Sequence, residues 1–165
     1  MPQVHRRQPP GEATENQTIE NILHVVARSG HTGVRVWREL GVLVLAQQIR
    51  KQQRQRLNRN FRNIVKELVA TKRLIKIYDR CYSVEEPQEP ENDPYLRDLM
   101  PLSEEDRERI LQFLQRSPTG RCYRDLQNKF RGFGPEVLKK ILIRLIREGY
   151  VDQDFEARFY KVIQN

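Results

Sequence analysis

Apolar residues recur every three or four positions in several stretches of the chain, which is the spacing of one face of an α-helix. Two long stretches share the pattern i, i+3, i+4, i+7 and i+8, and they predict helices over residues 61–69 and 138–146. Shorter stretches of the same kind predict an earlier helix in each half, over residues 17–28 and 103–114. The pattern of the first half is therefore repeated in the second.

A period-2 alternation of apolar and polar residues follows each of the two long helical stretches. It covers residues 74–84 and 150–162, with a turn in the middle of each segment, and it predicts two β-hairpins. Before the long helices, each half contains Thr-Gly followed by an aromatic-Arg-acid-Leu segment, at Trp37–Leu40 and Tyr123–Leu126. The order helix, turn, helix, helix, hairpin is expected twice.

Polar, proline-containing segments separate these two units. Residues 1–15 are expected to form a disordered tail, and residues 16–84 the first unit. Residues 85–101 are expected to be an acidic, proline-rich linker before the second unit, residues 102–165. Within that linker, residues 85–98 contain six acids, one arginine and three prolines. The proline content makes a stiff linker more reasonable than a freely flexible one.

Three helices closed by a two-stranded hairpin resemble the layout of a winged-helix domain. The chain is similar in layout to the winged-helix pairs of general transcription factors and of an RNA polymerase III subunit. The resemblance rests on the order of the elements and covers roughly residues 16–84 and 102–163. It implies a mainly α fold with small β-hairpin wings, built as two winged-helix domains in tandem. In such domains the third helix enters the DNA major groove and the wing contacts the backbone nearby.

The positive charge of the chain is concentrated in one segment. The 165 residues carry a formal net charge of +8, and residues 50–73 contain nine bases and only one acid. The rest of the chain contains equal numbers of bases and acids, so its net charge is zero. The first unit is also longer than the second between its turn and its third helix, which predicts a basic insertion at about residues 42–57. A cationic segment of this kind is typical of a surface that binds a polyanion.

The third helix of the first unit and its surroundings supply the candidate nucleic-acid site. With the apolar residues turned inward, Arg59, Arg62 and Lys66 are expected along another face, with asparagines among them. We therefore expect the following residues to contact nucleic acid: Arg50, Lys51, Arg54, Arg56, Asn58, Arg59, Arg62, Asn63, Lys66, Arg73, Lys76 and Arg80. Duplex DNA is the expected ligand, with RNA as the alternative.

The second unit is less basic and is expected to play another part. Its third helix offers Lys139, Lys140 and Arg144 as a secondary candidate site. Its hairpin carries acids, Asp152 and Glu156 among them, which would repel phosphates. This unit is therefore expected to dock a protein partner, in transcription, chromatin or recombination. The alternative function is an interaction scaffold of a larger nuclear assembly, in which the basic segment binds an acidic protein surface.

The aromatic residues have a structural explanation in most cases. The side chains expected in the cores are Trp37, Tyr123, Phe130, Phe133 and Phe159. Tyr78 and Tyr82 on the first hairpin are expected to be more open, because one face of a hairpin must be exposed. One of them could stack on a base or a sugar.

Enzymatic, metal-binding and membrane functions find no support in the sequence. The histidines are scattered, no glycine-rich phosphate loop is present, and Cys81 and Cys122 have no neighbouring ligands. No enzyme activity, metal, cofactor, small-molecule substrate or membrane contact is therefore expected. Two cysteines without a disulfide framework indicate a reducing compartment. Nuclear localisation is expected, or nucleoid or cytoplasmic localisation if the chain is not eukaryotic.

Overall fold

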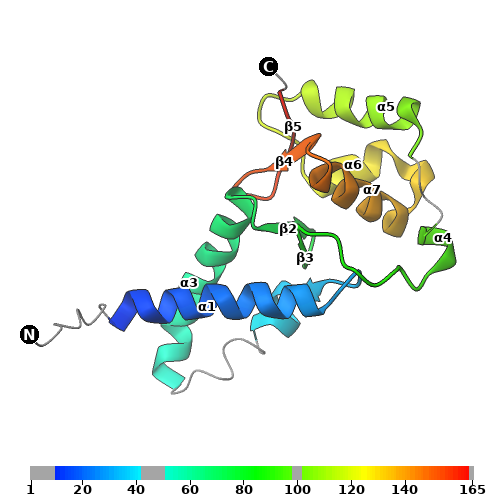
Figure 1. Cartoon of the computed structure of the whole chain (residues 1–165). Coiled ribbons are helices and arrows are strands. Elements are labelled where there is room, and N and C mark those ends of the chain that lie inside the picture. The colour runs from blue at the N-terminus through cyan, green and yellow to red at the C-terminus, as the bar shows by residue number, and fades with distance from the viewer. Residues whose placement is uncertain (1–9, 42–50, 98–101, 164–165) are drawn as a thin grey trace, which may run out of the picture.

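The computed structural model describes residues 10–41, 51–97 and 102–163 of the chain, with side chains for 15–41, 60–94, 96 and 102–163. The described chain is mainly helical and contains two small antiparallel sheets (Figure 1). This agrees with the expected combination of helices and small hairpins.

The first unit begins with a helix that is longer than its apolar pattern. Its elements are α1 (Pro10–Arg28), β1 (Val34–Arg35), the π-helical turn η1 (Val36–Leu40), α3 (Lys51–Ala70), β2 (Leu74–Ile77) and β3 (Arg80–Ser83). Proline is well tolerated in the first turn of a helix, where its missing N–H has no partner in any case. The prediction of a disordered tail through Glu15 is therefore wrong from Pro10 onward, and residues 1–9 lie outside the described residues.

The second unit repeats this order, and its first and last helices are shorter than those of the first unit. After the short α4 (Pro94–Arg97), it consists of α5 (Glu104–Gln115), α6 (Tyr123–Lys129), the 3-10 turn η2 (Arg131–Phe133), α7 (Pro135–Arg147), β4 (Val151–Gln153) and β5 (Phe159–Lys161). Ser103 caps α5 by accepting a hydrogen bond from the Asp106 N–H, as its position before three acids predicts. Pro135 opens α7.

The two sheets are built on the same plan. In the first, the strand order is β1-β3-β2, all antiparallel, with Ile75 opposite Tyr82 and Lys76 opposite Cys81. In the second, β4 pairs with β5, and Arg121 bridges to Phe159 on the other side of β5. In both units a short segment between the first two helical elements thus pairs with the last strand.

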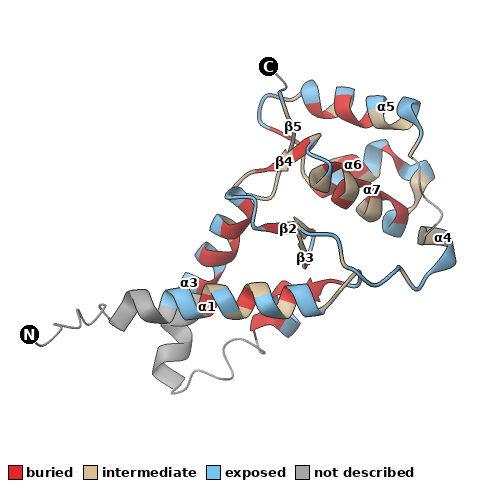
Figure 2. Cartoon of the chain, viewed as in Figure 1, coloured by how far each residue is buried: buried red, intermediate tan, exposed pale blue. Residues whose placement is uncertain are grey.

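The first hairpin is buried on both faces, because it lies between two hydrophobic clusters. Leu74 and Cys81 pack into the cluster of the first unit, against α1 and α3. Ile75, Ile77 and Tyr82 point the other way and belong to the cluster formed by the helices of the second unit. The two units therefore share one sheet instead of meeting only through the linker (Figure 2).

Hydrogen bonds between side chains and backbone fasten the two units at this sheet. Gln153 of β4 accepts a hydrogen bond from the Lys76 N–H (2.9 Å) and donates one to the Lys76 carbonyl oxygen (2.6 Å). Its amide therefore pairs with the edge of β2 much as another strand would. From α7, Arg147 donates from Nε and Nη2 to the Ser83 carbonyl oxygen, at 3.3 and 2.9 Å.

Candidate nucleic-acid interface

The basic segment of the sequence lies mostly on a single helix. Residues 51–57 of the expected insertion are the first turns of α3, which continues without a break to Ala70. Glutamine and arginine are good helix formers, so the segment extends the helix although it lacks an apolar face. Arg50 lies outside the described residues. Five other candidates lie within the backbone of α3, and their side chains are not described: Lys51, Arg54, Arg56, Asn58 and Arg59.

The C-terminal part of α3 has one buried and one exposed face (Figure 2). The buried face consists of Phe61, Ile64, Val65, Leu68 and Val69, each at most 5% exposed, which confirms the apolar pattern. The candidates Arg62 and Asn63 are exposed, and Lys66 is half-buried. The predicted division of this helix into an apolar and a cationic face is therefore present from Asn60 onward.

Arg62 lies over an aromatic ring at the surface. Its guanidinium carbon is 4.7 Å from the centroid of the Trp37 ring, which in turn meets the Phe61 ring edge-on at 6.0 Å. The Trp37 residue is 46% exposed, so its expected place in the core is wrong. The π-helical turn η1 buries Val36 and Leu40 instead and leaves the indole beside α3.

Lys66 and Lys72 are paired with the acidic hairpin of the second unit, residues 151–161. The Lys66 ammonium lies 3.4 Å from a Glu156 carboxylate oxygen and 5.1 Å from the centroid of the Phe155 ring. The Lys72 ammonium lies 2.9 Å from an Asp152 carboxylate oxygen. These pairs are largely exposed, so each contributes little to stability. They nevertheless place carboxylates beside the end of α3 that is nearest the second unit (Figure 1).

The remaining candidates of the first unit lie near the hairpin and have different surroundings. Arg73 is exposed, and the Lys76 side chain is half-buried. Arg80 donates to the carbonyl oxygens of Thr32 and Gly33, at 3.2 and 3.3 Å, so it holds the turn before β1.

The two hairpin tyrosines differ sharply. Tyr82 is 3% exposed and packs against the second unit, so its expected openness is wrong. Burial raises its pKa to about 12, with Arg80 acting in the opposite direction. Tyr78, at the tip of the hairpin, is 71% exposed.

The cations of α7 are engaged by neighbouring groups. Lys139 lies 3.3 Å from a Glu136 carboxylate oxygen. Lys140 lies 3.0 Å from a Glu91 carboxylate oxygen of the acidic linker and donates to the His31 carbonyl oxygen at 2.7 Å. Two of the three secondary candidates on α7, Lys139 and Lys140, therefore face acids of the same chain.

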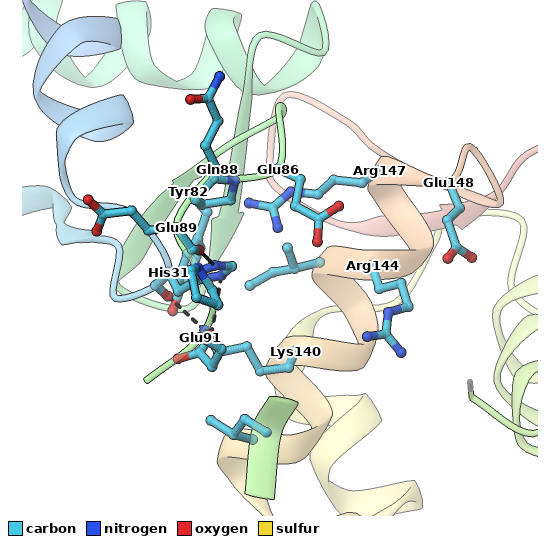
Figure 3. Close-up of a pocket in the computed structure, with 14 residues that line it drawn as sticks. His31, Tyr82, Glu86, Gln88, Glu89, Glu91, Lys140, Arg144, Arg147 and Glu148 are labelled. Atoms are coloured by element: carbon cyan, nitrogen blue, oxygen red, sulfur yellow. Dashed lines mark hydrogen bonds and ion pairs between the residues drawn. The ribbon is translucent and has the colours of Figure 1, made fainter. Parts of the chain in front are cut away.

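The acidic linker runs along this face of α7 and borders an open cavity of about 480 Å³ (Figure 3). Arg144 and Arg147 line it from α7, and Glu86 and Glu91 line it from the linker. Burial lowers the pKa of the Arg147 guanidinium, and nearby Glu86 opposes that shift. Because both cations and carboxylates line the cavity, Glu148 at the end of α7 among them, its lining favours neither sign of ligand strongly.

His31 fastens the linker from the first unit. Its Nδ1 lies 3.2 Å from a Glu91 carboxylate oxygen, and its Nε2 lies 2.7 Å from the Glu89 carbonyl oxygen. Both ring nitrogens thus face oxygen atoms of the linker, so this one side chain holds the linker against the first unit.

The chemistry outside these surfaces is sparse in the part of the chain that the structure describes. No group of three or more His, Cys, Asp or Glu residues there could hold a metal ion. No described helix is long and apolar enough to cross a membrane. Cys81 is buried, which raises the pKa of its thiol to about 12, and Cys122 helps to cap α6.

Several residues that shape the candidate interface are not found by sequence reasoning. They are His31, Glu91 and Phe155, to which the surface position of Trp37 and the pairing of Glu156 with Lys66 are added. The pattern of α3 contains no signal for the partners of its bases, because these partners are distant in the sequence. The acidity of the second hairpin is a signal of this kind, although by itself it indicates only that the hairpin repels phosphates.

Comparisons of the chain with protein-family models, curated proteins and solved structures find no match.

Proposed function

We propose that this protein binds duplex DNA through α3. The observation that carries the proposal is the exposed cationic face of one long helix, on which Arg62 and Asn63 are exposed over a buried apolar face. The same helix includes the basic stretch that begins at Lys51. Phosphate contacts supply most of the affinity of such a surface, and amides such as Asn63 can contact base edges or phosphates.

We further propose that the two units are winged-helix domains. The strand order β1-β3-β2 and the matching bridge from Arg121 to β5 support this proposal. In such a domain α3 is the helix that enters the major groove. The first hairpin has only a two-residue turn, since Ile77 pairs with Arg80. We therefore assign the main contacts to α3 instead of the hairpin.

The second unit is proposed to dock a protein partner rather than a second DNA segment. Lys139 and Lys140 of α7 are paired with Glu136 and Glu91, and the acidic hairpin adds carboxylates beside α3. A role in transcription, chromatin or recombination, in the nucleus, fits a protein with one DNA-binding and one protein-binding surface.

The alternative is a scaffold whose basic segment binds an acidic protein. It has one observation in its favour: Lys66 and Lys72 already pair with carboxylates, of Glu156 and Asp152. A polyanion of either kind would meet the same cations, so the two proposals must be separated by experiment.

A mobility-shift titration of duplex DNA at several salt concentrations tests the proposal. The wild type is expected to bind at ~100 mM salt, with log affinity falling in proportion to log salt. Replacing Arg59, Arg62 and Lys66 with alanine is expected to abolish the shift. For any residual binding, the salt slope becomes shallower by about 0.9 for each phosphate that α3 no longer neutralises.

The matched control removes three positive charges from the second unit outside α7. Arg109, Arg116 and Lys129 are all exposed there, and their replacement with alanine is expected to leave the shift unchanged. The DNA proposal fails if the wild type does not bind, or if the α3 variant binds as well as this control.

A further inference from the structure

The row of aromatic and cationic side chains beside α3 has a composition that duplex binding alone does not explain. Arg62 and Lys66 lie one helical turn apart, the first over Trp37 and the second over Phe155. The two aromatic residues are 46% and 43% exposed. They come from different parts of the chain, one from η1 and the other from the acidic hairpin.

The free energy gained by burying these two aromatic side chains is a weak explanation for this arrangement. A large aromatic side chain that is nearly half exposed gains only part of the free energy that full burial would provide. The chain contains a single tryptophan, and η1 places it at the surface beside the most basic helix. A phosphate-binding helix flanked by an exposed ring is the combination that holds unpaired nucleotides, whose bases stack while their phosphates meet cations.

We propose that the exposed Trp37 ring stacks on an unpaired base of a DNA strand that continues from the duplex held by α3. The proposal rests on the proposed function and defines its substrate as duplex DNA with an adjoining single-stranded segment.

Arg62 makes the ring accessible when the strand binds. Within the described part of the chain, Arg62 makes no ion pair and has the Trp37 ring as its partner. A phosphate offers the guanidinium a charge-assisted, bidentate contact that is stronger than a cation–π contact at an exposed site. Once Arg62 moves to the phosphate, the adjoining base takes its place on the ring.

Lys66 is less free than Arg62, and this difference decides which of the two rings takes the base. Its ammonium lies within 3.4 Å of a Glu156 carboxylate oxygen, so a phosphate there must compete with that acid. The unpaired base is therefore placed at Trp37 and not at Phe155.

Trp37 fluorescence provides a direct test, because a stacked base quenches the emission of the only tryptophan in the chain. The probes are a blunt duplex of two complementary strands and the same duplex with an oligothymidine overhang on one strand, each added to the full-length protein. The overhang probe is expected to quench the emission to a saturating level, while the blunt probe binds with little quenching. Equal quenching by both probes, or binding of the overhang probe without quenching, overturns the inference.

Affinities measured with dye-labelled probes provide an independent arm. Trp37→Leu removes the aromatic face but keeps an apolar side chain over Phe61. It is expected to weaken binding of the overhang probe about tenfold and to leave the blunt probe unchanged. Trp37→Phe is the second variant, in case the first does not fold, and is expected to lose less. Equal affinity of the folded variants and the wild type for the overhang probe contradicts the proposal.

Failure of this inference is distinguishable from failure of the proposed function. If both probes bind with the same affinity and neither changes the fluorescence, the stacking site is refuted while duplex binding stands. If neither probe binds at all, both proposals are refuted together. Quenching by the overhang probe without any binding of the blunt probe supports the stacking site and refutes duplex binding as the main activity.

Discussion

Helices α3 and α7 occupy equivalent places in the two units and both carry a row of bases, yet their surroundings differ. Two bases of α7 face acids of the same chain: Lys139 faces Glu136, and Lys140 faces Glu91 of the acidic linker. On α3, Arg62 lies over the indole ring of Trp37. Lys66, at the end of the helix nearest the second unit, is paired with Glu156.

A count of bases therefore does not identify a polyanion site. A helix is available to an external polyanion only where the protein does not neutralise it from within. The acidic linker runs along α7, and the acidic hairpin reaches the C-terminal end of α3. The middle of α3, at Arg62 and Asn63, is thus the described part of the basic segment that we expect to be available.

The largest expected effect comes from breaking the sheet that holds the two units together. Ile77 is fully buried in the cluster of the second unit although it belongs to the first. Ile77→Asp is expected to cost more than about 4 kcal/mol, because it buries a carboxylate without a partner. Both units should lose their dispersed NMR signals together.

The adjacent residue provides the control for this change. Tyr78 is 71% exposed and has a positive φ of 55°, which glycine adopts without strain. Tyr78→Gly is expected to leave the stability within about 1 kcal/mol of the wild type. If the signals of residues 102–163 survive in Ile77→Asp, the units are independent and the comparison of their helices loses its structural basis.

Unfolding at alkaline pH tests the stability of the same sheet without a substitution at the interface between the two units. Burial raises the pKa of Cys81 from 9.0 to about 12, while Lys76 acts in the opposite direction. The thiol has a higher pKa in the folded state than in the unfolded state, so its contribution to stability is fully present below about pH 9. This stabilisation is lost as the pH rises toward about 12, because the unfolded state ionises first.

The measurement is denaturant unfolding between about pH 8 and about pH 11, with the slope of stability against pH as the readout. The wild type is expected to lose stability over this range, and Cys81→Ala to lose less of it. A slope that Cys81→Ala leaves unchanged would exclude the thiol as the group responsible. Tyr82 and Tyr123, whose pKa values burial raises to about 12, act in the same direction at the upper end.

A smaller effect is expected at the hydrogen bonds between Gln153 and β2. Gln153→Ala leaves the Lys76 N–H and carbonyl oxygen without their present partner. The free energy of unfolding should fall by about 1–3 kcal/mol, measured by denaturant unfolding. Gln153→Glu keeps the size of the side chain but places a buried carboxylate oxygen against the Lys76 carbonyl oxygen, so it should cost at least as much as Gln153→Ala. A neutral Gln153→Ala would show that the hydrogen bonds of Gln153 do not contribute to holding the two units together.

The smallest effect on stability is expected for Glu91→Gln. This substitution tests most directly why α3 and not α7 is expected to bind DNA. Glu91→Gln removes the charge that faces both His31 and Lys140, at a cost of about 1 kcal/mol. It should also release Lys140 toward DNA, so that the salt slope of duplex binding steepens by up to about 0.9. Glu105→Gln in α5 is the control for the loss of one acid and should leave the slope unchanged. Equal slopes for both variants would mean that neutralisation by the linker is not what keeps α7 from binding DNA.

Much of the fold follows from the sequence because the apolar periods of its helices are strong. The buried face of α3 from Phe61 to Val69, the Ser103 cap and the hairpins all lie where the pattern predicts them. The start of α3 at Lys51 does not follow, because a polar stretch has no period that distinguishes a helix from a loop. The alternation of apolar residues around Ile75 and Ile77 predicts a strand. It cannot show that the face with these two side chains packs on the second unit.

The candidate site is predictable in its composition and not in its surroundings. The exposure of Arg62 follows from its place opposite the apolar face of α3. The contacts of Lys66 with Glu156 and of Lys140 with Glu91 join residues far apart in sequence, which only the packing of the units brings together. The exposure of Trp37 runs against expectation because a lone tryptophan in a small unit ordinarily fills the core.

A titration of the full-length protein with duplex DNA, followed by NMR at the backbone amides of both helices, distinguishes α3 from α7 as the binding site. We expect the largest shifts along α3, including Arg62 and Asn63, and small shifts at Lys140 and Arg147 of α7. Largest shifts on α7, or no shifts on either helix, would contradict the claim that the free cationic face of α3 is the site where this protein binds DNA.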